Sequence, residues 1–123
     1  MSLQEELLGF ANSVGDMFRR RVAETPDGLA FLDPDRAPEG PNQWTRYTWA
    51  ESRLLVDQLA AGLLARGLSR EQRVGIISTT RLEWILLDLA VACAAGATTT
   101  VYPNTAAGDV EFILDDSGTC IVV

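Results

Sequence analysis

The chain of 123 residues contains no lysine and no histidine, and all ten of its basic residues are arginines. A Schiff-base lysine, a lysine that binds a nucleotide phosphate, a histidine general base and a histidine-ligated metal are therefore excluded for this chain alone. Its 17 acidic residues give a formal net charge of -7. This charge argues against a nucleic-acid partner and against an anionic membrane surface as the main partner.

Cysteine is also scarce, since only Cys93 and Cys120 are present. Both lie in apolar runs without metal-ligand spacing, which is typical of reduced core residues in a cytosolic protein; a disulfide is the less favoured alternative.

The longest apolar run, residues 84–97, is interrupted by Asp88. It is shorter than the ~20 residues that span a bilayer, and no secretory signal opens the chain. We expect a cytoplasmic protein without a transmembrane segment.

Four amphipathic helices are indicated by apolar spacing and by capping residues. The first begins at Ser13 and ends before Pro26, because the residue ahead of a proline disfavours helix. The second begins with the capping box Thr48-x-x-Glu51 and closes at Gly67 in a left-handed conformation. Its predicted apolar stripe consists of Leu55, Val56, Leu59, Ala60, Leu63 and Leu64.

The third and fourth helices are predicted by the same kinds of signal. Thr80-x-x-Glu83 reads as another capping box, and Gly96 as the residue that terminates the third helix. Val110, Ile113 and Leu114 predict a fourth helix that ends at Ser117-Gly118. We interpret these caps as structural features, because caps occur wherever helices begin.

Short β-branched and apolar runs predict the strands. Residues 29–33 and 44–47 are expected to form a small antiparallel pair near the N-terminus. Residues 73–78, 98–101 and 119–123 are separated by single helices, so we expect three parallel strands with right-handed crossovers. The predicted fold class is therefore α/β, as part of a larger sheet.

No residue stands out as catalytic, cofactor-binding or metal-binding. Ser78-Thr79-Thr80-Arg81 follows a strand and opens a helix, where backbone N–H groups can hold an anion, but it lacks the glycines of a phosphate loop, and ordinary capping is favoured. The aromatic residues Trp44, Tyr47 and Trp49 are expected to pack rather than to stack on bases. Asp115-Asp116 is best explained as a solvated helix face.

Taken together, the segments resemble the N-terminal region of the AMP-forming acyl-CoA synthetases of the adenylate-forming superfamily. The matching segments, in the order of that family, are Phe18 to Pro26, Tyr47 to Gly67, Arg73 to Ser78, Glu83-Trp84, Ala95-Gly96-Ala97 followed by Tyr102-Pro103, and Val110 to Gly118. Within the family, Val101 to Thr105 and the phrase EFILDDSG are most similar to the long-chain fatty-acid-CoA ligase branch.

The resemblance implies a parent enzyme that joins a fatty acid to ATP as an acyl-adenylate, with magnesium on the phosphates, and then transfers the acyl group to coenzyme A. It also implies that the family's phosphate loop, adenine and magnesium segments, ribose-binding aspartate and lid lysine lie beyond Val123. Residues 13–123 are thus expected to be an incomplete N-terminal part of the large domain, inactive alone, and residues 1–12 a disordered or expression-derived N-terminus.

Two alternatives remain open. The first alternative to the ligase fragment is a free-standing α/β association module without catalysis. The second is a fragment of an enzyme that adenylates another carboxylic acid. The isolated chain is expected to self-associate, because a truncated sheet leaves apolar faces uncovered. For the parent, the expected location is cytoplasmic, with peripheral membrane association as a further option.

Overall fold

A computed structural model describes residues 9–34 and 43–123. The expectation of a disordered N-terminus over residues 1–12 therefore lies mostly outside the described residues. The described elements, in chain order, are α2 (Val14–Glu24), β1 (Leu29–Asp33), β2 (Thr45–Thr48), α3 (Trp49–Ala65), β3 (Arg73–Ile77), α4 (Leu82–Cys93), β4 (Ala97–Val101), α5 (Ala107–Ser117) and β5 (Thr119–Val122).

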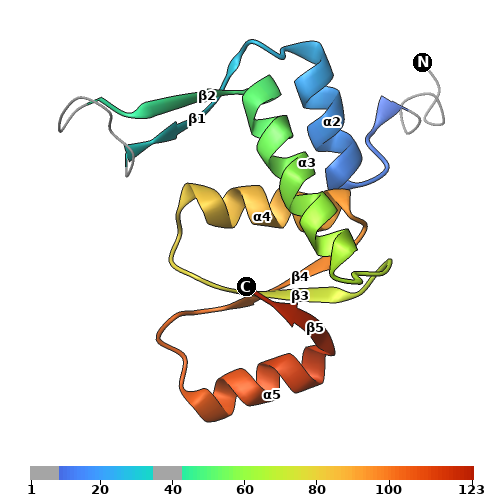
Figure 1. Cartoon of the computed structure of the whole chain (residues 1–123), viewed down its shortest axis with the longest axis vertical. Helices are drawn as coiled ribbons and strands as arrows, with labels where there is room; N and C mark the ends of the chain where they lie inside the picture. The colour runs from blue at the N-terminus through green and yellow to red at the C-terminus, as the bar shows by residue number, and fades with distance from the viewer. Residues whose placement is uncertain (1–8, 35–42) are drawn as a thin grey trace.

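The predicted α/β fold is confirmed. The strands β3, β4 and β5 form a parallel sheet in the order β4-β3-β5, and β1 pairs with β2 in an antiparallel hairpin. The helix α4 covers one face of the parallel sheet and α5 the other, while α2 and α3 pack on the outer side of α4 (Figure 1). The chain thus forms stacked layers, with the β1–β2 hairpin projecting to one side.

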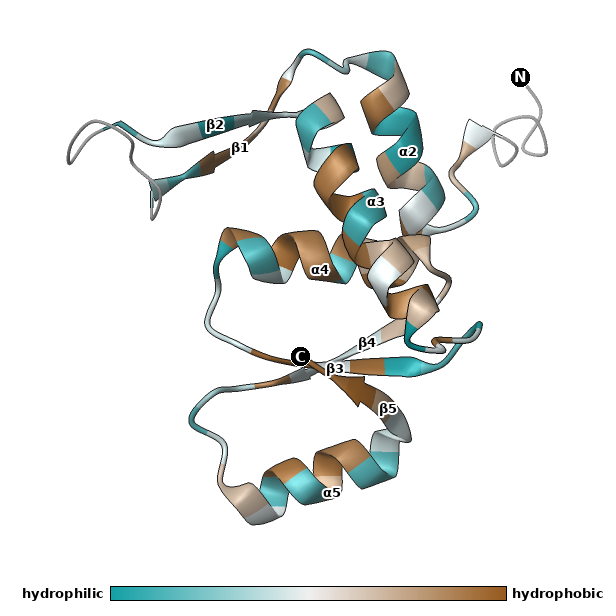
Figure 2. Ribbon diagram, in the orientation of Figure 1, coloured by the Kyte–Doolittle hydropathy of each residue, from teal (hydrophilic) through white to brown (hydrophobic). Residues whose placement is uncertain are grey.

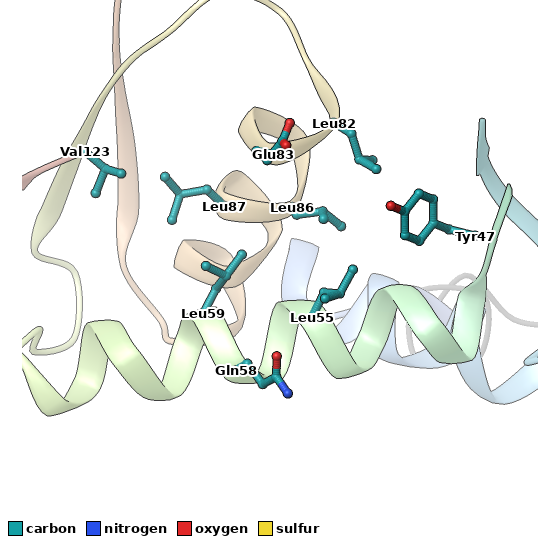
Figure 3. A pocket seen from close by; sticks show the side chains of 9 residues that line it. All are labelled: Tyr47, Leu55, Gln58, Leu59, Leu82, Glu83, Leu86, Leu87 and Val123. Carbon is teal, nitrogen blue, oxygen red and sulfur yellow. The ribbon is translucent and has the colours of Figure 1, made fainter. Parts of the chain in front are cut away.

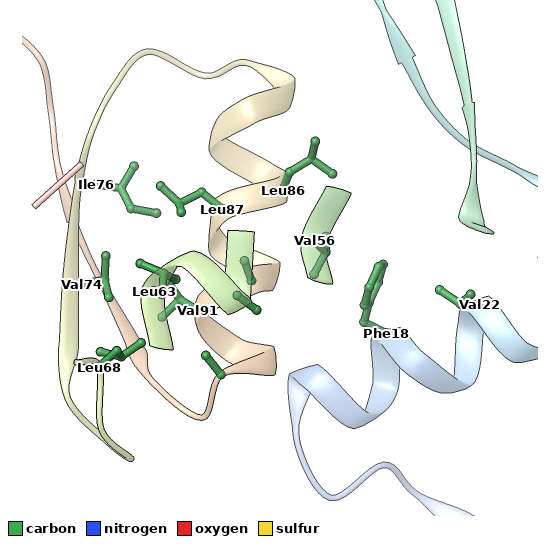
Figure 4. Close-up of a cluster of buried hydrophobic side chains, with 13 residues drawn as sticks. Phe18, Val22, Val56, Leu63, Leu68, Val74, Ile76, Leu86, Leu87 and Val91 are labelled. Carbon is green, nitrogen blue, oxygen red and sulfur yellow. The ribbon is translucent and has the colours of Figure 1, made fainter. Parts of the chain in front are cut away.

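The core lies between the parallel sheet and the helices α2, α3 and α4 (Figure 4). The strand β3 contributes Val74 and Ile76, which are 0% and 1% exposed. The hydrophobic colouring of β3 and of most of α4 in Figure 2 matches this position. A central strand with apolar residues in succession needs cover on both faces, and α5 supplies the second cover.

The apolar stripe predicted for α3 is only partly correct. Val56, Ala60 and Leu63 are buried, but Leu59 is 38% and Leu64 is 54% exposed. The predicted stripe includes residues that are exposed, because residues 9–34 and 43–123 cover only the side of α3 that faces α2 and α4. The second strand was predicted to begin at Trp44, but β2 begins one residue later, at Thr45. Trp44 is half exposed.

Two helix caps follow the sequence signals and one does not. The Ser13 hydroxyl accepts a hydrogen bond from the Asp16 N–H, and Thr48 and Glu51 form a reciprocal capping box. The capping box predicted at Thr80 is wrong, because α4 begins at Leu82 with Arg81 as its N-cap and no side-chain cap bond. The Glu83 carboxylate instead binds the Arg81 guanidinium at 2.7 and 2.9 Å.

The end of α4 also differs from the prediction. The residue in the left-handed conformation is Ala95, with φ of 61°, and not Gly96. The N–H groups of Ala95 and Gly96 donate to the carbonyls of Ala92 and Val91, as in a Schellman motif. Gly96 is needed for space, since an added Cβ would lie 3.1 Å from Val91 Cγ1 and 3.2 Å from the Gln72 carbonyl oxygen.

The contrast between the two threonines predicts different effects of their removal. Thr48→Ala should lower the free energy of unfolding by about 1 kcal/mol, because an orphan N–H of α3 loses its acceptor. Thr80→Ala, its matched control, should change it by less than about 0.5 kcal/mol. Urea unfolding followed by circular dichroism measures both, and equal losses would contradict the observed caps.

Ala95 is strained by its positive φ, so Ala95→Gly should raise the free energy of unfolding by about 0.5–1 kcal/mol. The side chain of Ala95 is exposed, so no packing is lost. Ala94→Gly is the control, because Ala94 has φ of -85° and is buried. It should destabilise, and a destabilising Ala95→Gly in the same thermal melts would contradict the assignment.

Candidate functional site

The topology of the sheet marks one place where ligands bind in α/β folds. β3 and β4 are neighbours, yet the chain leaves β3 toward α4 on one face and leaves β4 toward α5 on the other (Figure 1). Such a switch point lies at the carboxyl ends of the strands. Here it is flanked by residues 78–81 after β3 and by residues 102–105 after β4.

Each of the two loops at this switch point has internal hydrogen bonds. The Ser78 hydroxyl donates to the Thr79 carbonyl at 3.0 Å, and Arg81 holds Glu83 as described above. On the other loop, the Thr105 N–H closes a turn on the Tyr102 carbonyl at 3.0 Å, and the Tyr102 side chain is 75% exposed. A carboxylate already neutralises the arginine that the anion hypothesis requires, so the geometry favours a structural role for residues 78–81.

The predicted packing role of the aromatic residues holds for Trp49. Its ring lies 6.3 Å from Phe18 and 5.9 Å from Phe31, centroid to centroid, and the Arg21 guanidinium lies 5.9 Å from the ring centroid. The indole thereby ties the β1–β2 hairpin to α2 and α3. Trp44, which is half exposed, does not share this packing role.

An apolar pocket of about 400 Å³ lies between α3 and α4 (Figure 3). Leucines form most of its wall: Leu55 and Leu59 from α3, and Leu82, Leu86 and Leu87 from α4. Tyr47 and Val123 lie at opposite ends of the row of labelled side chains (Figure 3). The pocket can bury apolar surface.

The pocket's polar groups do not form acid–base machinery. They are those of Tyr47, Gln58 and Glu83, and the Glu83 carboxylate is held by Arg81. Residues 9–34 and 43–123 contain no cluster of three or more side chains that could hold a metal ion. The arrangement therefore offers apolar contact and no reactive pair.

The acidic residues of α5 lie where the sequence predicted, on its outer face. Asp115 and Asp116 are exposed and line a shallow depression with Glu111 and Phe112. Phe112 is 67% exposed. The inner face of α5 contacts β4 and β5 and leaves these carboxylates in water.

The two thiols lie in different surroundings and both are free. Burial raises the pKa of Cys93, which is half-buried at the end of α4, where Arg19 Nη2 donates to its carbonyl at 3.0 Å. Cys120 is exposed on β5, and its thiol donates to the Arg73 carbonyl at 3.3 Å. The prediction of two core cysteines is thus wrong for Cys120, because β5 is at the margin of the sheet.

Comparison with known proteins places this fold and sequence in a family. The AMP-binding enzyme family matches residues 18–123. This chain belongs to that family. The match covers every described strand and helix from within α2 onward, so the family resemblance seen in the sequence is confirmed.

The relatives include long-chain ligases. The long-chain-fatty-acid–CoA ligase FadD15 of Mycobacterium bovis is 34% identical over 110 residues, which are 89% of this chain and 18% of that protein. The structure named Mycobacterium tuberculosis fatty acyl CoA synthetase superposes with a TM-score of 0.78 at 27% identity, over 89% of this chain and 20% of that one. The chain therefore spans about a fifth of the relatives it matches.

A third comparison locates the chain within the family. The inhibitor-bound N-terminal domain of FACL13 from Mycobacterium tuberculosis superposes with a TM-score of 0.77 at 27% identity, over 89% of this chain and 26% of that domain. The chain is thus similar to a part of the N-terminal domain of long-chain ligases. The predicted branch of the family is confirmed.

The contrast between the thiols is testable. At about pH 8, iodoacetamide should alkylate Cys120 faster than Cys93, because the thiolate is the nucleophile and burial keeps Cys93 protonated. Mass spectrometry of peptides cut at aspartate measures both rates, because Asp109 and Asp116 lie between the two cysteines, and urea-unfolded protein serves as the control in which the rates converge. Equal rates in the folded chain would contradict the burial of Cys93.

Proposed function

We propose that this chain is the N-terminal scaffold of an ATP-dependent long-chain fatty-acid–CoA ligase and is inactive alone. The observation that carries the proposal is the family match over residues 18–123 together with the FadD15 identity over 110 residues. The parent reaction forms an acyl-adenylate from fatty acid and ATP, and then an acyl-CoA. Its substrates would be fatty acid, ATP and coenzyme A, with Mg²⁺ as the metal.

The described residues do not fit Mg²⁺ or ATP, and this supports a scaffold role. The chain has no lysine for a phosphate, and its described part has no cluster of three metal ligands. The arginine after β3, Arg81, already binds the Glu83 carboxylate. We propose that no residue of this chain is catalytic, cofactor-binding or metal-binding.

What the chain supplies to such an enzyme is a rigid part of the sheet. The strand β3 is buried on both faces, and its neighbours β4 and β5 hold it in parallel register. Catalytic groups on other segments need a platform of this kind, because a misplacement of about 1 Å is enough to slow a reaction strongly.

A second candidate is association without catalysis, and a specific observation favours it. The strand β5 is at the edge of the sheet, and apolar grooves adjoin it. If this candidate is correct, the chain binds another polypeptide at the β5 edge and its grooves. Self-association would use the same surface. A fragment of an enzyme that adenylates another carboxylic acid stays a third candidate.

For the location of the parent we propose the cytoplasm, supported by two free thiols. Among the described residues, no helix has the length and apolar character needed to cross a membrane. Peripheral contact of the parent with membranes is compatible with this proposal.

Reconstitution tests the scaffold role. The chain is mixed with a FadD15 that lacks its own matching N-terminal segment, and fatty-acid-dependent release of pyrophosphate from ATP is measured. Neither part alone should release pyrophosphate, and the mixture should. The isolated FadD15 segment is the positive control, and a Gly15→Leu chain, in which α2 cannot pack on α4, is the negative control.

Two results would contradict the proposal. Pyrophosphate release by the chain alone would show that it carries catalytic groups. Failure of the chain to restore activity, when the FadD15 segment does restore it at the same concentration, would show that it is no scaffold for this reaction.

A further inference from the structure

We draw no further inference here: the strongest candidate, the apolar pocket of about 400 Å³ between α3 and α4 together with the groove that adjoins it beside β5, is an apolar surface for which nothing among residues 9–34 and 43–123 shows what covers it.

Discussion

The position of α4 is the constraint on which the rest of the structure depends. This helix buries Leu86, Leu87, Ala90 and Val91, and it packs on the sheet with one side and on α2 and α3 with the other. Two glycines allow this. A Cβ on Gly15 would lie 2.9 Å from the Ala92 carbonyl oxygen, so α2 touches the backbone of α4. Gly96 lets the chain turn tightly from α4 into β4 beneath Val91 and Leu68.

With α4 held in this way, the parallel sheet has one well-covered face and one face covered by a single helix. No residue of α5 is fully buried. The packing is therefore unequal, with α2, α3 and α4 on one side of the sheet and α5 alone on the other. The chain spans about a fifth of its relatives and shares their fold, and its pocket between α3 and α4 holds no acid–base pair.

Local signals predicted much of this fold because they act over a few residues. The capping box of Thr48 and Glu51 needs only its own backbone, Gly67 adopts the predicted positive φ, and Gly118 ends α5 as predicted. One signal failed because an equally local contact competed with it. Thr80 and Glu83 have the spacing of a cap, but Arg81 takes the Glu83 carboxylate and remains extended, so the helix begins later.

The sequence by itself determined the alternation of helices and strands, the family and the absence of lysine and histidine chemistry, because periodicity, motif order and composition are properties of the chain alone. Only the tertiary structure decided which apolar residues are covered, that Ala95 rather than Gly96 carries the positive φ, and that Cys120 is exposed. These depend on which elements meet. Gly96 is packed against Val91 and Leu68, and β5 has a neighbour on one side only.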